Sequence, residues 1–159
     1  MKQPRAIVIL TAAVVLLSSC IKPLPQGTVA HYNQSYGNDA RNKLDIYLPE
    51  DRDTGTAVVM LIHGGAWVAG DKGGGELRDI RNDLLGAGYA VASMNYRYAC
   101  GDHTKHSEDV QAALELISAR ADEWQINDHL FALMGFSAGG HLALLYGHAY
   151  DTSDVVKTV

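Results

Sequence analysis

The chain has 159 residues, of which 47% are hydrophobic and 19% are charged, and its formal net charge is −5 at pH 7. This composition is typical of a globular protein and excludes a disordered polar chain, while the length suits one domain. No run of basic residues is present, so the sequence predicts no nucleic-acid partner.

The N-terminal end has the composition of an export signal. Lys2 and Arg5 precede an apolar stretch over residues 6–17. This stretch is shorter than the about 20 residues that cross a bilayer, so the pattern favours a cleaved secretion signal over a transmembrane helix. The following segment Leu17-Ser18-Ser19-Cys20 resembles a bacterial lipobox.

The lipobox resemblance implies cleavage before Cys20 and attachment of lipid to that cysteine. Ile21, rather than an aspartate, follows it, which implies retention at the outer membrane with the protein facing the periplasm. The alternative is an ordinary signal peptide with an incidental cysteine. We therefore divide the chain into a lipoprotein signal peptide (1–19), a proline-containing tether (20–28) and a domain (29–159).

The domain alternates between strand-like and helix-like segments. Short alternating segments predict an antiparallel strand pair at 29–32 and 43–48, and continuous apolar runs predict buried strands at 57–62, 89–94 and 130–134. The segments between and after these runs predict helices at 76–85, ending at Gly86 or Gly88, at 107–120, capped by Ser107, and at 138–150. A β-prone segment follows at 155–159. The fold class is therefore α/β, with a mostly parallel sheet and crossover helices.

The sequence Gly135-Phe136-Ser137-Ala138-Gly139 lies between a predicted strand and a predicted helix. This is the pattern of a nucleophile elbow, in which a sharp turn holds the serine hydroxyl exposed at the end of the strand. We therefore interpret Ser137 as a nucleophile. The alternative is a surface serine in a glycine-rich turn.

A second glycine-containing loop, His63-Gly64-Gly65-Ala66-Trp67, directly follows another buried strand. Glycines allow backbone amides to turn toward a bound carbonyl oxygen, so the loop has the features of an oxyanion loop.

Together these motifs resemble the α/β-hydrolase fold, in the esterase and lipase branch related to hormone-sensitive lipase and to bacterial feruloyl or acetyl esterases. The resemblance extends from Asn42 to Tyr150 and includes four further motifs: 44–49 (LDIYLP), 70–72 (GDK), 95–97 (NYR) and 108–110 (EDV).

The resemblance implies a serine esterase acting on short or aromatic acyl esters, including those of carbohydrates, through an acyl-enzyme on Ser137. It places the oxyanion hole at the amides of Gly65, Ala66 and Ala138, and it implies a small-molecule ester as partner. We expect no cofactor, and the spacing of the histidines predicts no metal site. A formamidase or a peptidase of the same fold is the alternative enzyme.

Other residues near these motifs receive structural roles. We expect His63 to hold the oxyanion loop in shape, and Asp109 to contact the backbone or Arg97. Trp67 and Tyr96 either line the cleft or pack in the core.

Cys100 is expected to be a passive residue. His103 and His106 are placed in a loop beside Asp102, without the spacing of a metal site.

The partners that a serine nucleophile requires cannot be assigned. In this fold the triad acid and histidine follow the serine, but His141 and His148 lie on the serine's own helix and are not expected to reach its hydroxyl. We expect the chain to be a truncated copy, inactive as given, with the edge of strand 130–134 unpaired. The alternative is a non-catalytic lipoprotein or binding module that retains half the fold.

Overall fold

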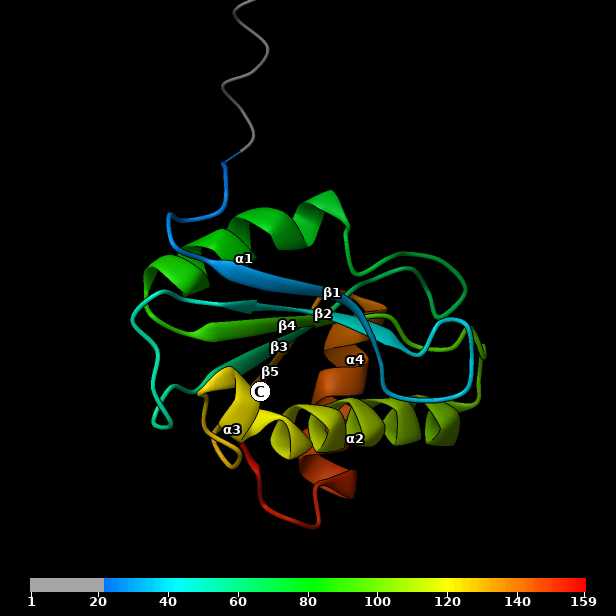
Figure 1. Cartoon of the computed structure of the whole chain (residues 1–159). Helices are drawn as coiled ribbons and strands as arrows, with labels where there is room; N and C mark the ends of the chain where they lie inside the picture. The colour runs from blue at the N-terminus through cyan, green and yellow to red at the C-terminus, as the bar shows by residue number, and fades with distance from the viewer. Residues whose placement is uncertain (1–21) are drawn as a thin grey trace, which may run out of the picture.

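The computed structural model describes residues 22–159 and shows one mixed sheet with helices on both faces (Figure 1). Its strands are β1 (Val29–Ser35), β2 (Lys43–Leu48), β3 (Val58–Ile62), β4 (Ala90–Met94), β5 (Phe131–Gly135) and β6 (Val156–Thr158). Their order is β1-β2-β4-β3-β5-β6. β2 is antiparallel to both neighbours, whereas the four strands from β4 to β6 run parallel. The predicted α/β fold class is confirmed.

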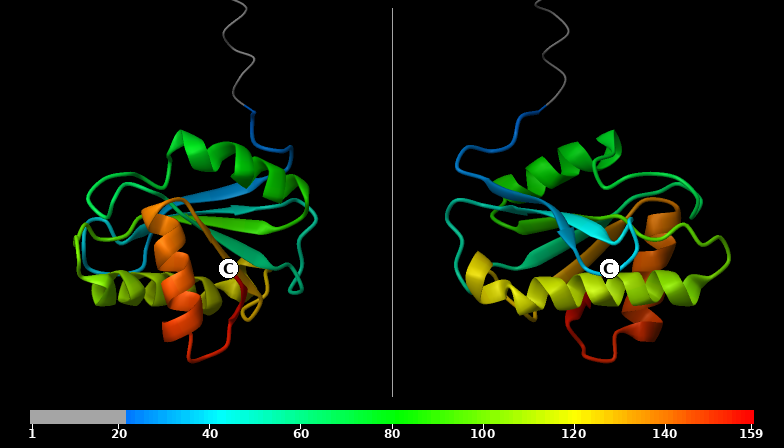
Figure 2. Two further views of the ribbon diagram at one scale, coloured as in Figure 1. Left: turned by 180° about the vertical axis from the view of Figure 1, so that it is seen from behind. Right: turned by 45° about the vertical axis from the view of Figure 1, so that its right-hand side comes forward.

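Helix α1 (Gly75–Gly86) covers one face of the sheet, and α2 (His103–Ala119), the short α3 (Ala121–Trp124) and α4 (Ala138–Leu145) lie on the other (Figure 2). Alternate side chains of β3 supply the two cores. Met60 and Ile62 pack with residues of α2 and α4, and Val59 and Leu61 pack with residues of α1. A strand covered on both faces needs apolar residues at every position, which explains the uninterrupted apolar run.

Helix α2 begins before the predicted position. The side chain of Asp102 caps the helix by accepting a hydrogen bond from the Lys105 amide at 3.2 Å. The Ser107 hydroxyl instead donates to the carbonyl of His103, one turn back, at 3.0 Å. The predicted cap at Ser107 is therefore wrong, and His103 and His106 lie in a helix rather than in a loop.

The C-terminal elements also differ from expectation. The predicted helix 138–150 consists of α4 followed by a π-helical turn, η2 (Tyr146–Tyr150). The prediction of an unpaired edge at strand 130–134 is wrong, because β6 pairs in parallel with β5 through Phe131 and Val156. At the end of α1, Gly88 has a left-handed backbone with φ of +90°. Gly86 is the last helical residue.

The central register places the two motif strands side by side. β3 and β5 pair in parallel with Ile62 opposite Gly135, so the segments that follow them leave the sheet together.

None of the helices within residues 22–159 is long and apolar enough to cross a membrane. The signal peptide predicted for residues 1–19 and the lipidation predicted at Cys20 lie outside the described residues.

Candidate active site

Ser137 occupies a strained turn between β5 and α4. Its backbone has φ of 49° and ψ of −115°, a conformation that L-residues rarely adopt, and the residue is exposed. Gly139 makes the turn possible, because a Cβ atom there would lie 2.2 Å from the carbonyl oxygen of Ile62. The chain thus bends tightly against β3 and leaves the serine hydroxyl at the surface.

The loop after β3 approaches this turn. A Cβ atom placed on Gly64 would lie 3.5 Å from the Cβ atom of Ser137. Gly65 has φ of +126°, and Ala66 and Trp67 also have positive φ values of 50° and 62°. The amides of residues 68 and 69 close the loop by donating to the Gly65 carbonyl at 3.0 and 2.9 Å.

Three amide groups near the serine lack internal partners. Among the hydrogen bonds formed within residues 22–159, none uses the N–H of Gly65, Ala66 or Ala138 as donor. Ala138 is the first residue of α4, where an amide has no intrahelical acceptor. These amides are the ones that the family resemblance assigns to an oxyanion hole.

His63 supports the loop through contacts of its buried ring. The ring is fully buried and stacks on Tyr96 with centroids 4.4 Å apart. Its Nδ1 lies 2.6 Å from the Gly64 carbonyl, which can only accept, and its Nε2 lies 3.2 Å from Nη2 of Arg41, which can only donate. These partners require a neutral ring protonated on Nδ1, and burial lowers the pKa of His63. The prediction that His63 holds the loop in shape is confirmed.

Arg41 is a site residue that the sequence did not reveal. Besides His63, its guanidinium donates to the carbonyls of Tyr96 at 2.8 Å and Gly70 at 3.1 Å, and it lies over the Tyr98 ring at 3.7 Å. Arg41 therefore links both ends of the loop after β3 to the segment after β4. The residues around position 41 form no local pattern that predicts hydrogen bonds with His63 and Tyr96, which are 22 and 55 residues away in the sequence.

The motif 70–72 is fixed by partly buried polar contacts. Asp71 accepts from the side-chain amide of Asn95 at 2.9 Å, and Asn95 in turn accepts from the Lys72 amide at 2.6 Å. The ammonium group of Lys72 pairs with buried Asp45 on β2 at 2.8 Å. The resemblance motifs 44–49, 70–72 and 95–97 thus meet in one network beneath the loop.

Asp109 has the predicted structural role. Its carboxylate accepts from the backbone amide of Arg97 at 2.7 Å, from Arg97 Nε at 2.8 Å and from the Asn42 side chain at 3.0 Å. Tyr96 is fully buried in the core, whereas Trp67 is partly buried against it.

No triad partner of Ser137 lies in the part of the chain that the structure describes. Over residues 22–159 the Ser137 side chain makes no hydrogen bond. The ring of His141 packs against those of Trp67 and His103 instead, and His148 is exposed on η2. The same residues contain no group of histidine, cysteine and carboxylate side chains arranged to hold a metal ion, and Cys100 is an exposed free thiol.

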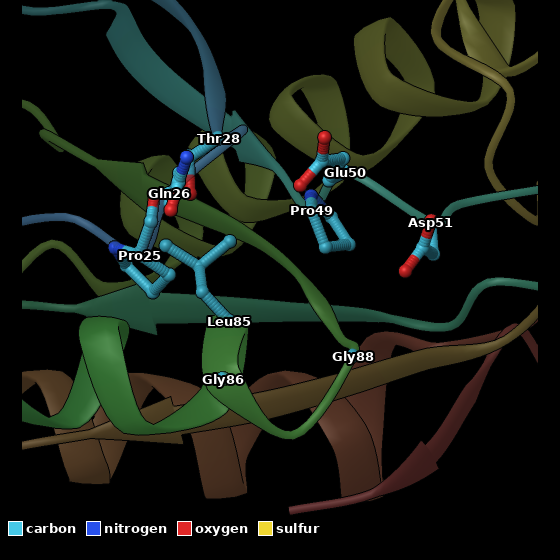
Figure 3. Close-up of a pocket in the computed structure, with 9 residues that line it drawn as sticks. All are labelled: Pro25, Gln26, Thr28, Pro49, Glu50, Asp51, Leu85, Gly86 and Gly88. Carbon is cyan, nitrogen blue, oxygen red and sulfur yellow. Dashed lines mark hydrogen bonds between the residues drawn. The ribbon is translucent and has the colours of Figure 1, made fainter.

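A separate pocket of about 240 Å³, whose lining residues are drawn in Figure 3, lies at the opposite end of the parallel strands from Ser137. It is lined by the tether, by the turn after β2 and by the end of α1, including Glu50 and Gly88. Gly88 precedes the start of β4, whereas Ser137 follows the end of β5, and these two strands run in the same direction. This pocket is therefore not part of the candidate active site.

Comparison with known proteins supports an esterase relationship. Residues 44–159 match the BD-FAE family model. The probable carboxylic ester hydrolase LipM of Mycobacterium tuberculosis is 38% identical over 115 residues, which cover 70% of this chain and 26% of LipM. An acetylxylan esterase of Xylanibacter ruminicola is 31% identical over 117 residues, which cover 73% of this chain and 24% of the esterase. The chain thus spans about a quarter of the length of these relatives.

Solved structures that resemble this chain are also esterases. A truncated form of a carbohydrate esterase from gut microbiota is 32% identical with a TM-score of 0.67, over 79% of this chain and 46% of that one. Esterase B from Lactobacillus rhamnosis, in a structure that names a tributyrin phosphonate, is 28% identical with a TM-score of 0.65, over 87% of this chain and 47% of that one. The chain belongs to the BD-FAE family, and its fold is that of the α/β-hydrolase esterases.

Proposed function

We propose that the natural protein hydrolyses carboxylic esters, with Ser137 as the nucleophile. The observation that carries this proposal is the placement of an exposed serine, in a strained turn, next to backbone amides that have no internal acceptor. In the reaction Ser137 Oγ forms a bond to the ester carbonyl carbon and passes its proton to a general base. The tetrahedral intermediate expels the alcohol, which takes up that proton, and water then releases the acid from the acyl-enzyme.

The proposed oxyanion hole consists of the amides of Gly65, Ala66 and Ala138. Donors that are already in place when charge develops on the carbonyl oxygen need no reorganisation, and each contributes about 3 kcal/mol of transition-state stabilisation. The network of His63 and Arg41 keeps the first two amides in place.

For substrates we propose short or aromatic acyl esters, including esters of carbohydrates. The names of two relatives support this class, one being an acetylxylan esterase and the other a carbohydrate esterase. The tributyrin phosphonate named with the Lactobacillus enzyme supports a short acyl chain.

Labelling with a fluorophosphonate probe tests the nucleophile. We expect the natural protein to be labelled and to hydrolyse p-nitrophenyl acetate, and Ser137→Ala to lose both properties. Ser153→Ala, which changes an exposed serine beyond α4, is the matched control. Labelling that persists in Ser137→Ala would reject the assignment. A folded natural protein without labelling or hydrolysis would favour the non-catalytic module.

We also propose that lipid on Cys20 anchors the protein to the bacterial envelope, facing the periplasm from the outer membrane. Cys20→Ser is expected to move the protein from the membrane fraction to the soluble fraction. Cys100→Ser, which removes the other cysteine, is expected to leave fractionation unchanged. Membrane fractionation of Cys20→Ser that equals the wild type would refute the anchor.

A further inference from the structure

Three aromatic side chains from separate elements meet beside Ser137. They are Trp67 of the oxyanion loop, His103 in the first turn of α2 and His141 in the first turn of α4. The ring centroids are 5.4 Å apart for Trp67 and His103, 5.4 Å for Trp67 and His141, and 4.7 Å for the two histidines. We call these three residues the ring cluster. The ring cluster connects the loop after β3 and the first turn of α4 with α2.

We propose, on the basis of the ester-hydrolysing function above, that His103 is a positioning residue that holds the oxyanion loop against the elbow through ring packing.

The backbone conformation of the oxyanion loop explains why it needs supporting contacts. Trp67 directly follows Ala66, and both have a left-handed backbone that disfavours residues with a side chain. The loop needs external contacts to keep this conformation. His141 lies one turn after the nucleophile, and its amide donates to the Ser137 carbonyl at 3.0 Å. The ring of His103 packs against both Trp67 and His141, which also contact each other, and so adds a second link between the loop and the helix that follows the serine.

The contacts of His103 are made by its ring rather than by hydrogen bonds. Within residues 22–159, its buried Nδ1 has no hydrogen-bond partner, and neither has the buried Nε1 of Trp67. Behind His103, the fully buried ring of His106 lies 5.9 Å away. Since the nitrogens contribute no hydrogen bond, an aromatic ring without them should serve equally well. This distinguishes positioning by packing from a role in proton transfer.

The experiment compares His103→Ala with His103→Phe in the natural protein. A misplacement of about 1 Å in a catalytic group can cost about 100-fold in rate. We expect His103→Ala to lower kcat by about 10- to 100-fold with KM changed less than about threefold, and His103→Phe to stay within about threefold of wild type. His129→Ala, which removes a histidine with a 73% exposed side chain, is the matched control.

A second measurement, by NMR, reports on the packing of His103 against Trp67. A ¹⁵N-labelled sample gives one indole N–H resonance for each tryptophan, and the Trp67 resonance is assigned as the one that is lost in Trp67→Phe. We expect the Trp67 resonance to shift in His103→Ala and to stay unshifted in His129→Ala. If His103→Ala does not fold, His103→Leu, which keeps bulk but removes the ring, takes its place.

The outcomes separate this proposal from the proposed function. A natural protein that neither hydrolyses esters nor is labelled at Ser137 refutes the function. An active protein whose His103→Ala variant keeps wild-type kcat, or whose Trp67 resonance does not move, refutes the positioning role alone. Loss of activity in His103→Phe equal to that in His103→Ala also refutes it, because ring packing would then not be the cause.

Discussion

Replacing Ser137 with glycine should stabilise the fold while it removes the nucleophile. Ser137 has φ of 49° and ψ of −115°, and a residue with a side chain in this sparsely populated region lowers the free energy of unfolding by about 1–3 kcal/mol. Glycine adopts positive φ readily, but its greater freedom in the unfolded chain costs about 0.5–1 kcal/mol. The serine side chain makes no capping hydrogen bond to α4, so no cap is lost. The free energy of unfolding should therefore rise by about 1 kcal/mol.

Ser137→Ala is the decisive comparison, because alanine removes the hydroxyl but keeps the Cβ atom and the strain. Urea denaturation of both variants gives the two free energies, and a thermal scan should place the Ser137→Gly midpoint about 2–4 °C above that of Ser137→Ala. Equal stability of the two variants would refute the reasoning, since it would mean that the elbow stores no backbone strain.

Three further predictions concern the surroundings of the serine. Gly139→Ala should destabilise the fold by about 1–3 kcal/mol in urea denaturation, because its Cβ atom would collide with the Ile62 carbonyl. Arg41→Met should lower stability by about 1–3 kcal/mol in the same assay, and also kcat, because Nε2 of buried His63 loses its donor. Burial lowers the pKa values of His63 and His106, so both rings stay neutral to lower pH in the fold than in the unfolded chain, which takes up protons below about pH 6.5. The free energy of unfolding should then fall, as pH decreases from about 6.5, by at most about 1.4 kcal/mol per pH unit for each histidine.

Each of these predictions has a control. Gly86→Ala, at a helix position where a new Cβ atom meets nothing within 4 Å, should stabilise rather than destabilise, and equal effects of the two glycine changes would contradict the clash. Arg41→Lys should not restore kcat, because an ammonium group cannot reproduce the guanidinium fork; full recovery would count against the bracing role. His106→Phe should reduce the pH slope, and exposed His148→Ala should not; a slope unchanged by His106→Phe would contradict the linkage argument.

The sequence could predict those features that depend on neighbouring residues. The apolar run of β3, the glycines around Ser137 and the loop after Ile62 are local patterns, and the structure places them as expected. The start of α2 was missed because Asp102 and Ser107 are both good capping residues, and only tertiary packing of the first turn selects the earlier one.

Long-range partners could not be predicted in the same way. Arg41 reaches His63, Tyr96 and Gly70 because the sheet order brings the start of β2 next to the end of β4, and that order is not visible near residue 41. The pairing of β6 with β5 and the ring cluster around His103 arise likewise from contacts between distant segments.

The parallel register of β3 and β5 limits how proteins of this kind can change in length. Ile62 lies opposite Gly135, so the amides of one loop and the serine of the other meet only while this alignment is kept. One residue inserted into either strand would shift one loop by about 3.3 Å along the sheet, farther than a hydrogen bond can stretch. The turns at the opposite end of the parallel strands carry no such constraint. Relatives that keep the chemistry should therefore differ in length in the turns after α1 and before β5, and hardly ever within the two strands.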